Sequence, residues 1–326
     1  SCAIDHNGKG LYTTKMGHGD AIHLTHFDPS RKGLQVWDCH ENKRDGSTYR
    51  DAATGEVLFQ KQHTASCEKE EECLELTLRK VYDFALNTPL DEISFILETA
   101  RLNKAAAERS FEGNYGHGLG KMLRGTYEHK VMGDSVFSHI LSYTSGACDA
   151  RMAGAMIPVM SNSGSGNQGI SATLPVLVFA EENDKSEEEL IRALMLSHLT
   201  VIYIKQSLGR LSALCGCVVA ATGSSCGITW LMGGTYDQVA YAVQNMIANL
   251  TGMICDGAKP SCALKVTTGV STAVLSAIMA MENRCVTSVE GIIDEDVDQS
   301  IRNLTKIGSK GMNETDKLVL EIMTGK

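Results

Sequence analysis

Five cysteines in two stretches of the chain have the side-chain type that binds soft metals or attacks substrates. Cys255 and Cys262 flank the polar stretch DGAKPS, and Cys215, Cys217 and Cys226 lie in LCGCVVAATGSSCG. Thiolates select zinc or iron–sulfur clusters over hard cations. The alternatives are a nucleophilic thiol or an inert one, because most free cysteines only fill space as small buried side chains.

The spacing of these cysteines argues against a structural zinc site. Such sites usually contain Cys-x2-Cys pairs, whereas here one, eight and six residues separate neighbouring cysteines. A complete iron–sulfur cluster takes four thiolates. Three thiolates would leave one iron open, and an open iron is a Lewis acid. From the residues alone, these cysteines could either bind a cluster or be inert buried thiols.

Four glycine-bearing stretches, residues 114–121, 161–175, 214–227 and 250–264, are predicted as loops between helical runs. In the second, Gly164, Gly166 and Gly169 would free backbone amides, and the following helix would point its N-terminus at the same place. We expect a carboxylate there, because the Lys-Ser/Thr of a phosphate loop is absent. A plain interhelical turn is the alternative. The candidate substrate-binding residues are Ser163, Gly164, Ser165, Gly166, Asn167 and Gln168.

The sequence does not decide the roles of four more polar residues. His198 lies within an apolar helical run and is either a paired core histidine or a site residue. Asp149 and Arg151 could form an ion pair, cap a helix or contact a substrate. The role of Lys121, which ends the first glycine stretch, is equally undecided.

The order of elements predicts an α+β protein. A small β-rich portion, residues 1–65, precedes a large, mostly buried helical bundle, residues 66–326. Partial alternation predicts strands at 21–27, 33–42 and 55–63, with turns between them. Apolar residues at helical spacing, and Ser186 with Glu189 as a capping box, predict helices. The expected helical ranges are 66–88, 91–113, 134–154, 186–209, 235–254, 264–281 and two short helices in 294–326.

Composition excludes several classes of protein. The 326 residues carry a net charge of −9, and no basic cluster with aromatics occurs, so nucleic acid is not an expected partner. No apolar run reaches about 18 residues, so no membrane span is expected. Eleven cysteines without a compact framework indicate a reducing, cytoplasmic location.

Four long stretches closely resemble the L-cysteine desulfidase family, which includes serine dehydratase alpha-subunit-like proteins. The family is related to the iron–sulfur-dependent L-serine dehydratases. The resemblance runs from about residue 55 to the C-terminus. Its stretches are GSGNQGISATLPV, LSHLTVIYIKQSLGRLSALCGC, NMIANLTGMICDGAKPSCALK and IRNLTKIGSKGMNETDKLVLEIM.

This resemblance implies a lyase with a 4Fe–4S cluster on three cysteines, which by position are Cys215, Cys255 and Cys262. The implied reaction is α,β-elimination of a small amino acid, L-cysteine to pyruvate, ammonia and sulfide or L-serine to pyruvate and ammonia. The open iron would bind the leaving group, and residues 163–168 would hold the carboxylate. The resemblance implies no pyridoxal phosphate.

The sequence departs from the family pattern at one place. Family members begin with a longer segment that carries GCTEP-like and PGTG-like motifs, and neither string occurs here. We expect either a truncation or a partner chain that supplies this segment. The alternative function is a catalytically idle binding or regulatory module, or one part of a split enzyme. The small-residue helices also suggest a homodimer.

Overall fold

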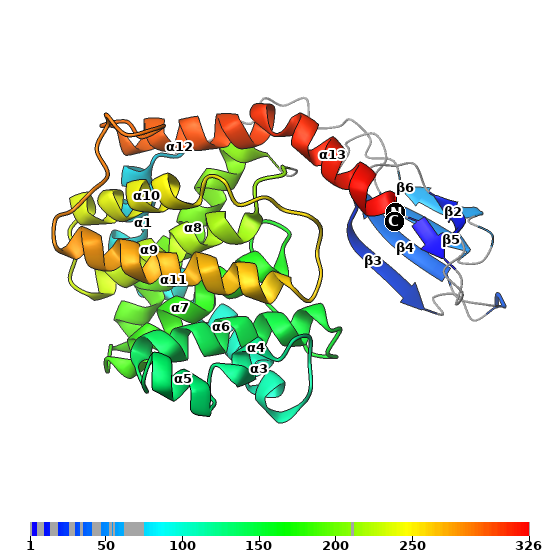
Figure 1. Ribbon diagram of the computed structural model, residues 1–326, viewed down its shortest axis with the longest axis horizontal. Coiled ribbons are helices and arrows are strands. Elements are labelled where there is room, and N and C mark those ends of the chain that lie inside the picture. Colours follow the sequence, from blue (N-terminus) through cyan, green and yellow to red (C-terminus); the bar gives the residue numbers. More distant parts are fainter. Residues whose placement is uncertain are drawn as a thin grey trace. The chain divides into compact units, whose positions relative to one another are not determined.

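The computed structural model describes residues 2–4, 10–13, 19–25, 30–32, 35–40, 47–51, 54, 56–61, 75–209 and 212–325. The chain divides into two compact units, Ser1–Glu75 and Leu76–Lys326. The predicted domain boundary, between residues 65 and 66, lies outside the described residues. The chain is mostly helical, which confirms the predicted bundle (Figure 1).

The described part of the first unit contains six strands in two antiparallel sheets. One sheet pairs β1 with β2, and the other has the order β3–β4–β5–β6. The predicted turn at residues 44–55 is wrong, because it contains β5, whose Thr48 and Tyr49 suit a strand. The strands are β1 (Cys2–Ile4), β2 (Gly10–Thr13), β3 (Gly19–Thr25), β4 (Gln35–His40), β5 (Ser47–Asp51) and β6 (Val57–Lys61).

The second unit is a bundle of helices that begins at Leu78. The Ser186–Glu189 capping box opens α8 as predicted. The helices before the 161–165 turn are α1 (Leu78–Asn87), α2 (Leu90–Ile93), α3 (Leu97–Glu112), α4 (Leu119–Met122), α5 (Thr126–Val131) and α6 (Val136–Met152). Those after it are α7 (Gly166–Glu182), α8 (Glu187–Leu208), α9 (Gly216–Leu231), α10 (Tyr236–Leu250), α11 (Cys262–Met281), α12 (Val297–Lys306) and α13 (Asn313–Thr324).

Four segments differ from the predicted ones. The predicted helix 91–113 is interrupted by a 3-10 turn, Ser94–Ile96, and a π turn, Ile307–Gly311, joins α12 to α13. Most of the predicted loops 161–175 and 214–227 is helical, since α7 starts at Gly166 and α9 at Gly216. Glycines inside these helices serve packing: a Cβ at Gly227 would stand 2.9 Å from the carbonyl oxygen of Ala193 in α8.

The centre of the bundle is α9, which packs against α7, α8, α10 and α11 (Figure 1). It is apolar nearly all round, as expected of a helix with neighbours on every side. In the described part of the chain, α11 alone is long and apolar enough to cross a membrane, and about half of its apolar window is buried inside the bundle. A core helix of a globular protein has the same length and composition.

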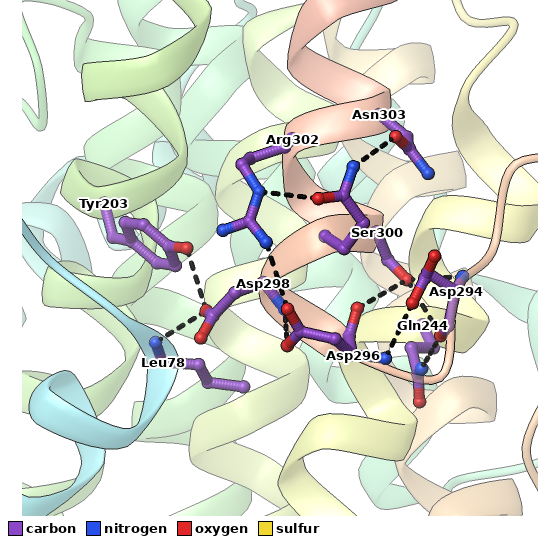
Figure 2. Close-up of polar contacts among 10 residues, drawn as sticks. Leu78, Tyr203, Gln244, Asp294, Asp296, Asp298, Ser300, Arg302 and Asn303 are labelled. Atoms are coloured by element: carbon purple, nitrogen blue, oxygen red, sulfur yellow. Dashed lines mark hydrogen bonds and ion pairs between the residues drawn. The ribbon is translucent and has the colours of Figure 1, made fainter.

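An acidic corner, Asp294, Asp296 and Asp298, begins α12 (Figure 2). The Asp298 carboxylate accepts hydrogen bonds from the Leu78 amide at 2.9 Å and from the Tyr203 hydroxyl at 2.8 Å. Asp294 and Asp296 each accept an amide two residues along the chain, at 3.0 Å. The three carboxylates therefore start α12 and tie it to α1 and α8.

Candidate active site

The stretch predicted to bind a carboxylate is a tight turn followed directly by a helix. Asn162 and Ser165 exchange two backbone hydrogen bonds, at 3.1 and 3.0 Å. Between them Ser163 and Gly164 have φ of 48° and 82°, the left-handed conformation that two-residue hairpin turns require. The Ser165 hydroxyl then caps α7 by accepting the Gln168 amide at 3.4 Å. The turn therefore has one defined backbone conformation.

A buried polar network fixes this turn from the side of α3 and α8. The Asn162 side-chain amide donates to Nδ1 of His198 at 3.0 Å, and Nε2 of His198 lies 2.9 Å from the Thr173 hydroxyl. Asn103 joins Thr173 to the Met160 amide, at 3.1 and 2.9 Å. Burial lowers the pKa of His198 to about 4. His198 is therefore a neutral, paired core histidine that supports the turn.

On the opposite side, the start of α7 meets the last turn of α6. The Cys148 thiol donates to Oδ1 of Asn167 at 3.4 Å, and the Asn167 side-chain amide donates to the Met152 sulfur at 3.2 Å. Both Cys148 and Asn167 are buried. The sequence reasoning missed Cys148 and Met152. Their i, i+4 spacing on an apolar helix, which places both on one face, was the available signal.

Two glycines allow polar side chains to lie directly on the backbone. A Cβ at Gly166 would overlap Nε of Arg151 and stand 2.8 Å from its Cδ, and a Cβ at Gly216 would stand 2.7 Å from Nε2 of Gln168. Gln168 is 6 % exposed, and its Oε1 has no hydrogen-bond partner. The start of α7 thus bridges the end of α6 and the start of α9, where Cys215 lies.

The structure brings the segments of Cys215 and Cys255 together. Leu214 and Ile254 form an isolated antiparallel bridge, in which the Cys215 amide donates to Met253 at 3.0 Å and the Cys255 amide donates to Ala213 at 2.6 Å. These two cysteines, 40 positions apart in sequence, are held by backbone pairing.

The third predicted ligand, Cys262, is the first residue of α11. Its sulfur accepts the Lys259 amide at 3.4 Å, so the loop from 255 to 262 folds back over it. Asp256 closes the same loop by ion pairs with Lys259 and Lys265. Cys215, Cys217 and Cys262 also belong, with Cys148, to one buried cluster between α6, α9 and α11.

The thiols lie close enough to influence one another's ionisation. A hydrogen bond from Cys217 and the charge of Lys265 lower the pKa of Cys215 against the effect of burial. Burial raises the pKa of Cys255, and the charges of Cys215 and Cys262 raise it further. Burial also raises the pKa of Cys148, with contributions from Cys262 and Cys215. Cys215 is thus the thiol most ready to become a thiolate, the form that binds metals.

No three His, Cys, Asp or Glu side chains in the described residues converge tightly enough to hold a single metal ion. A 4Fe–4S cluster makes a different demand, because its cysteines bind separate irons and so stand further apart. Cys255 interacts electrostatically with both Cys215 and Cys262, and the pKa of Cys215 is lowered. All three are thiols, the donor type that iron–sulfur clusters take.

The remaining candidates have structural contacts. Oδ2 of the buried Asp149 accepts the Gly120 amide at 3.0 Å, while its Oδ1 has no hydrogen-bond partner. Burial raises the pKa of Asp149, and the amides of Gly120, His117 and Leu119 lower it. It makes no ion pair with Arg151, although both are among the described residues. Lys121 donates to the Gly113 carbonyl at 3.3 Å.

Two cysteines outside the predicted ligand set bond to groups of the bundle. The Cys226 thiol donates to the Thr222 carbonyl at 3.3 Å within α9, and the Cys285 thiol donates to Oε1 of Gln244 at 3.1 Å. Neither thiol interacts electrostatically with Cys215, Cys255 or Cys262 in the described part of the chain. Both serve as matched controls for the candidate ligands.

Comparison with known proteins identifies the family. The model of the serine dehydratase alpha chain family matches residues 32–321. The chain belongs to that family. The match covers all the helices that carry the thiols and the α7 turn, so the candidate active site lies wholly within the family region.

Curated relatives extend this result. A UPF0597 protein of Bacteroides fragilis is 88 % identical over 271 residues, which cover 83 % of this chain and 63 % of the relative. One from Bacteroides thetaiotaomicron is 86 % identical over 281 residues, 86 % of this chain and 66 % of the relative. One from Vibrio campbellii is 43 % identical over 312 residues, which cover 96 % of this chain and 67 % of the relative. The chain thus spans under two thirds of the length of the first two.

Proposed function

We propose that this protein is an iron–sulfur lyase that eliminates the β-substituent of a small amino acid in the cytoplasm. The substrate is L-cysteine, which yields pyruvate, ammonia and sulfide, or L-serine, which yields pyruvate and ammonia. In both reactions the substrate loses its Cα proton and its β-thiolate or hydroxide. The resulting aminoacrylate tautomerises and is hydrolysed by water.

One observation carries the proposal: thiols from distant parts of the sequence meet beside a polar helix start. Cys215 and Cys255 lie on paired segments. Gln168, from the first turn of α7, lies against Gly216, the residue after Cys215. A metal group and a polar substrate can therefore share this part of the bundle, which is what a metal-assisted elimination needs.

Cys215, Cys255 and Cys262 would hold the 4Fe–4S cluster. When bound, the cluster would supply a Lewis acid that lowers the cost of expelling thiolate or hydroxide. The chain's own residues would do the rest of the binding. The amides and side chains of residues 163–168 would orient the carboxylate, and the apolar surroundings of the thiols would exclude water.

The direct test is pyruvate formation by protein purified without oxygen, with L-cysteine and L-serine as separate substrates. The proposal expects pyruvate from at least one of them, with sulfide released in equal amount from cysteine. Iron-loaded protein that forms no pyruvate from either would contradict it.

The alternative proposal is a split enzyme or an idle binding module, and the partial coverage of the relatives favours testing it. The same assay would be repeated with the part of the Bacteroides fragilis relative that this chain does not cover added as a separate polypeptide. Pyruvate formed only with the added segment would indicate a split enzyme. A homodimer would be recognised by its molecular mass in solution.

A further inference from the structure

Lys265 connects two of the segments that carry the candidate ligands. It lies one helical turn after Cys262 on α11, so both residues share a face of that helix. Its ammonium group donates to the Ile254 carbonyl at 2.7 Å and pairs with the Asp256 carboxylate. Ile254 and Asp256 are the chain neighbours of Cys255. Lys265 therefore holds the Cys255 segment against the start of α11.

A second lysine of this loop, Lys259, has all of its ammonium hydrogens in use. It donates to the carbonyls of Asp256 and Gly257 at 2.9 and 3.2 Å, and pairs with the Asp256 carboxylate at 2.6 Å. An ammonium group has three hydrogens to donate. Lys265 has only the acceptors at Ile254 and Asp256 among the described residues. Its third N–H is therefore available to a further acceptor.

The loop between Cys255 and Cys262 also carries surplus positive charge. Lys259 and Lys265 share the Asp256 carboxylate, and neither pairs with another carboxylate in the described part of the chain. The Lys265 side chain is 26 % exposed, and its charge interacts with the thiols of Cys215 and Cys255. Because partial burial weakens screening by water, this charge acts on the thiols.

Two helix starts add to the positive field at the thiols. Cys215 occupies the N-cap position of α9, and Cys262 is the first residue of α11. A helix N-terminus carries partial positive charge, which stabilises a thiolate placed there. Three thiolates would outweigh a dicationic 4Fe–4S core by a single negative charge. The surplus charge of the loop has the sign that offsets it.

We propose that Lys265 is a positioning residue of the cluster site: its ammonium group holds the Cys255 segment on α11, and its charge offsets that of the thiolates and raises the reduction potential of the cluster. The inference rests on the proposed function and adds a residue outside the three-cysteine ligand set. A nearby cation favours the reduced cluster, because reduction adds negative charge. The same cation slows the loss of iron, because it stabilises the thiolate form that binds the metal.

The reduction potential tests this role, because a residue that only supports the fold would not shift it according to charge. Protein reconstituted without oxygen with iron and sulfide would be titrated with dithionite, and the electron paramagnetic resonance signal of the reduced cluster would report the midpoint. Lys265→Met should weaken one-electron reduction about tenfold, a shift of about 59 mV to more negative potential. Asp256→Asn should shift the potential in the opposite direction, and Lys265→Arg should keep the wild-type value.

The matched control is Lys104→Met, which should have the wild-type potential. Lys104 is similarly exposed and pairs with Glu181 at 2.7 Å, and no thiol of the described residues acts on its charge. The double variant Lys265→Met/Asp256→Asn restores the net charge of the loop and should return toward the wild-type potential. Lys265→Met should also lose iron to a chelator about tenfold faster than the wild type.

Equal potentials in the wild type, Lys265→Met and Asp256→Asn, or shifts of the same sign in both variants, would overturn the proposal. If Lys265→Met takes up no iron, Asp256→Asn decides, and a potential at or below that of the wild type would overturn it. The expected shifts in protein that forms no pyruvate would support the role of Lys265 and contradict only the proposed reaction.

Discussion

The acidic corner at the start of α12 and the start of α7 both gather polar side chains, yet they use them in opposite ways. In the corner, the carboxylates of Asp294, Asp296 and Asp298 accept amide or hydroxyl hydrogens (Figure 2). At α7, Arg151 has only a sulfur acceptor, and Oε1 of Gln168 has no partner. Paired groups stabilise a fold, whereas an unpaired buried acceptor such as Oε1 of Gln168 costs stability and is free to accept from a ligand.

The comparison makes a distinction that variants can test. Changes among the paired groups should lower the free energy of unfolding. Changes among the unpaired groups should leave it unchanged or raise it, and should weaken binding instead.

The largest expected effect concerns the paired network beneath the α7 turn. His198 has a pKa of about 4 in the fold because it is buried, against about 6.5 when unfolded. The unfolded chain therefore takes up the proton first as pH falls. The free energy of unfolding should drop by roughly 3 kcal/mol as pH falls from above 6.5 to 4.

Chemical denaturation across this pH range measures the effect. The matched variant is His198→Gln, which should be less stable at pH 7 and should lose this part of the pH dependence. A variant with the same pH slope as the wild type would show that His198 is not the group responsible.

The second-largest expected effect on the free energy of unfolding concerns the acidic corner. Asp298→Ala would leave the Leu78 amide and the buried Tyr203 hydroxyl without their acceptor. The free energy of unfolding should fall by about 2 kcal/mol. Asp316→Ala, an exposed aspartate on α13, should change it by less than about 0.5 kcal/mol. Equal losses in the two variants would remove the distinction between the corner and an ordinary surface carboxylate.

The smallest effect should have the opposite sign. Gln168→Met removes an unpaired buried oxygen at similar volume. The free energy of unfolding should stay constant or rise by up to about 1 kcal/mol, while pyruvate formation falls. A clear loss of stability would mean that Gln168 supports the fold and that its free acceptor carries no functional meaning.

Sequence reasoning located the bundle and the cysteines but misjudged the glycines. The capping box at Ser186 and the helix over Val136–Met152 depend on local patterns, so both could be predicted. The starts of the helices at Gly166 and Gly216 could not be predicted. These glycines are required by contacts with Arg151 and Gln168, which are distant in sequence.

The candidate site was predictable in its residue types more than in its arrangement. Cys215, Cys255 and Cys262 were named from the family resemblance, and their ligand role stays a prediction. The pairing of Leu214 with Ile254 and the contact of Cys148 with Asn167 join residues that no local pattern connects. Arg151 was left open among three roles, because only the structure reveals that its charge has no partner.

The central claim is that three specific thiols hold a cluster, and metal content tests it most directly. Wild-type protein, Cys255→Ser and Cys285→Ser would be reconstituted without oxygen with iron and sulfide, and the bound iron counted per chain. We predict about four irons in the wild type and in Cys285→Ser, and a large loss in Cys255→Ser. Equal iron in the two variants, or none in the wild type, would contradict the account.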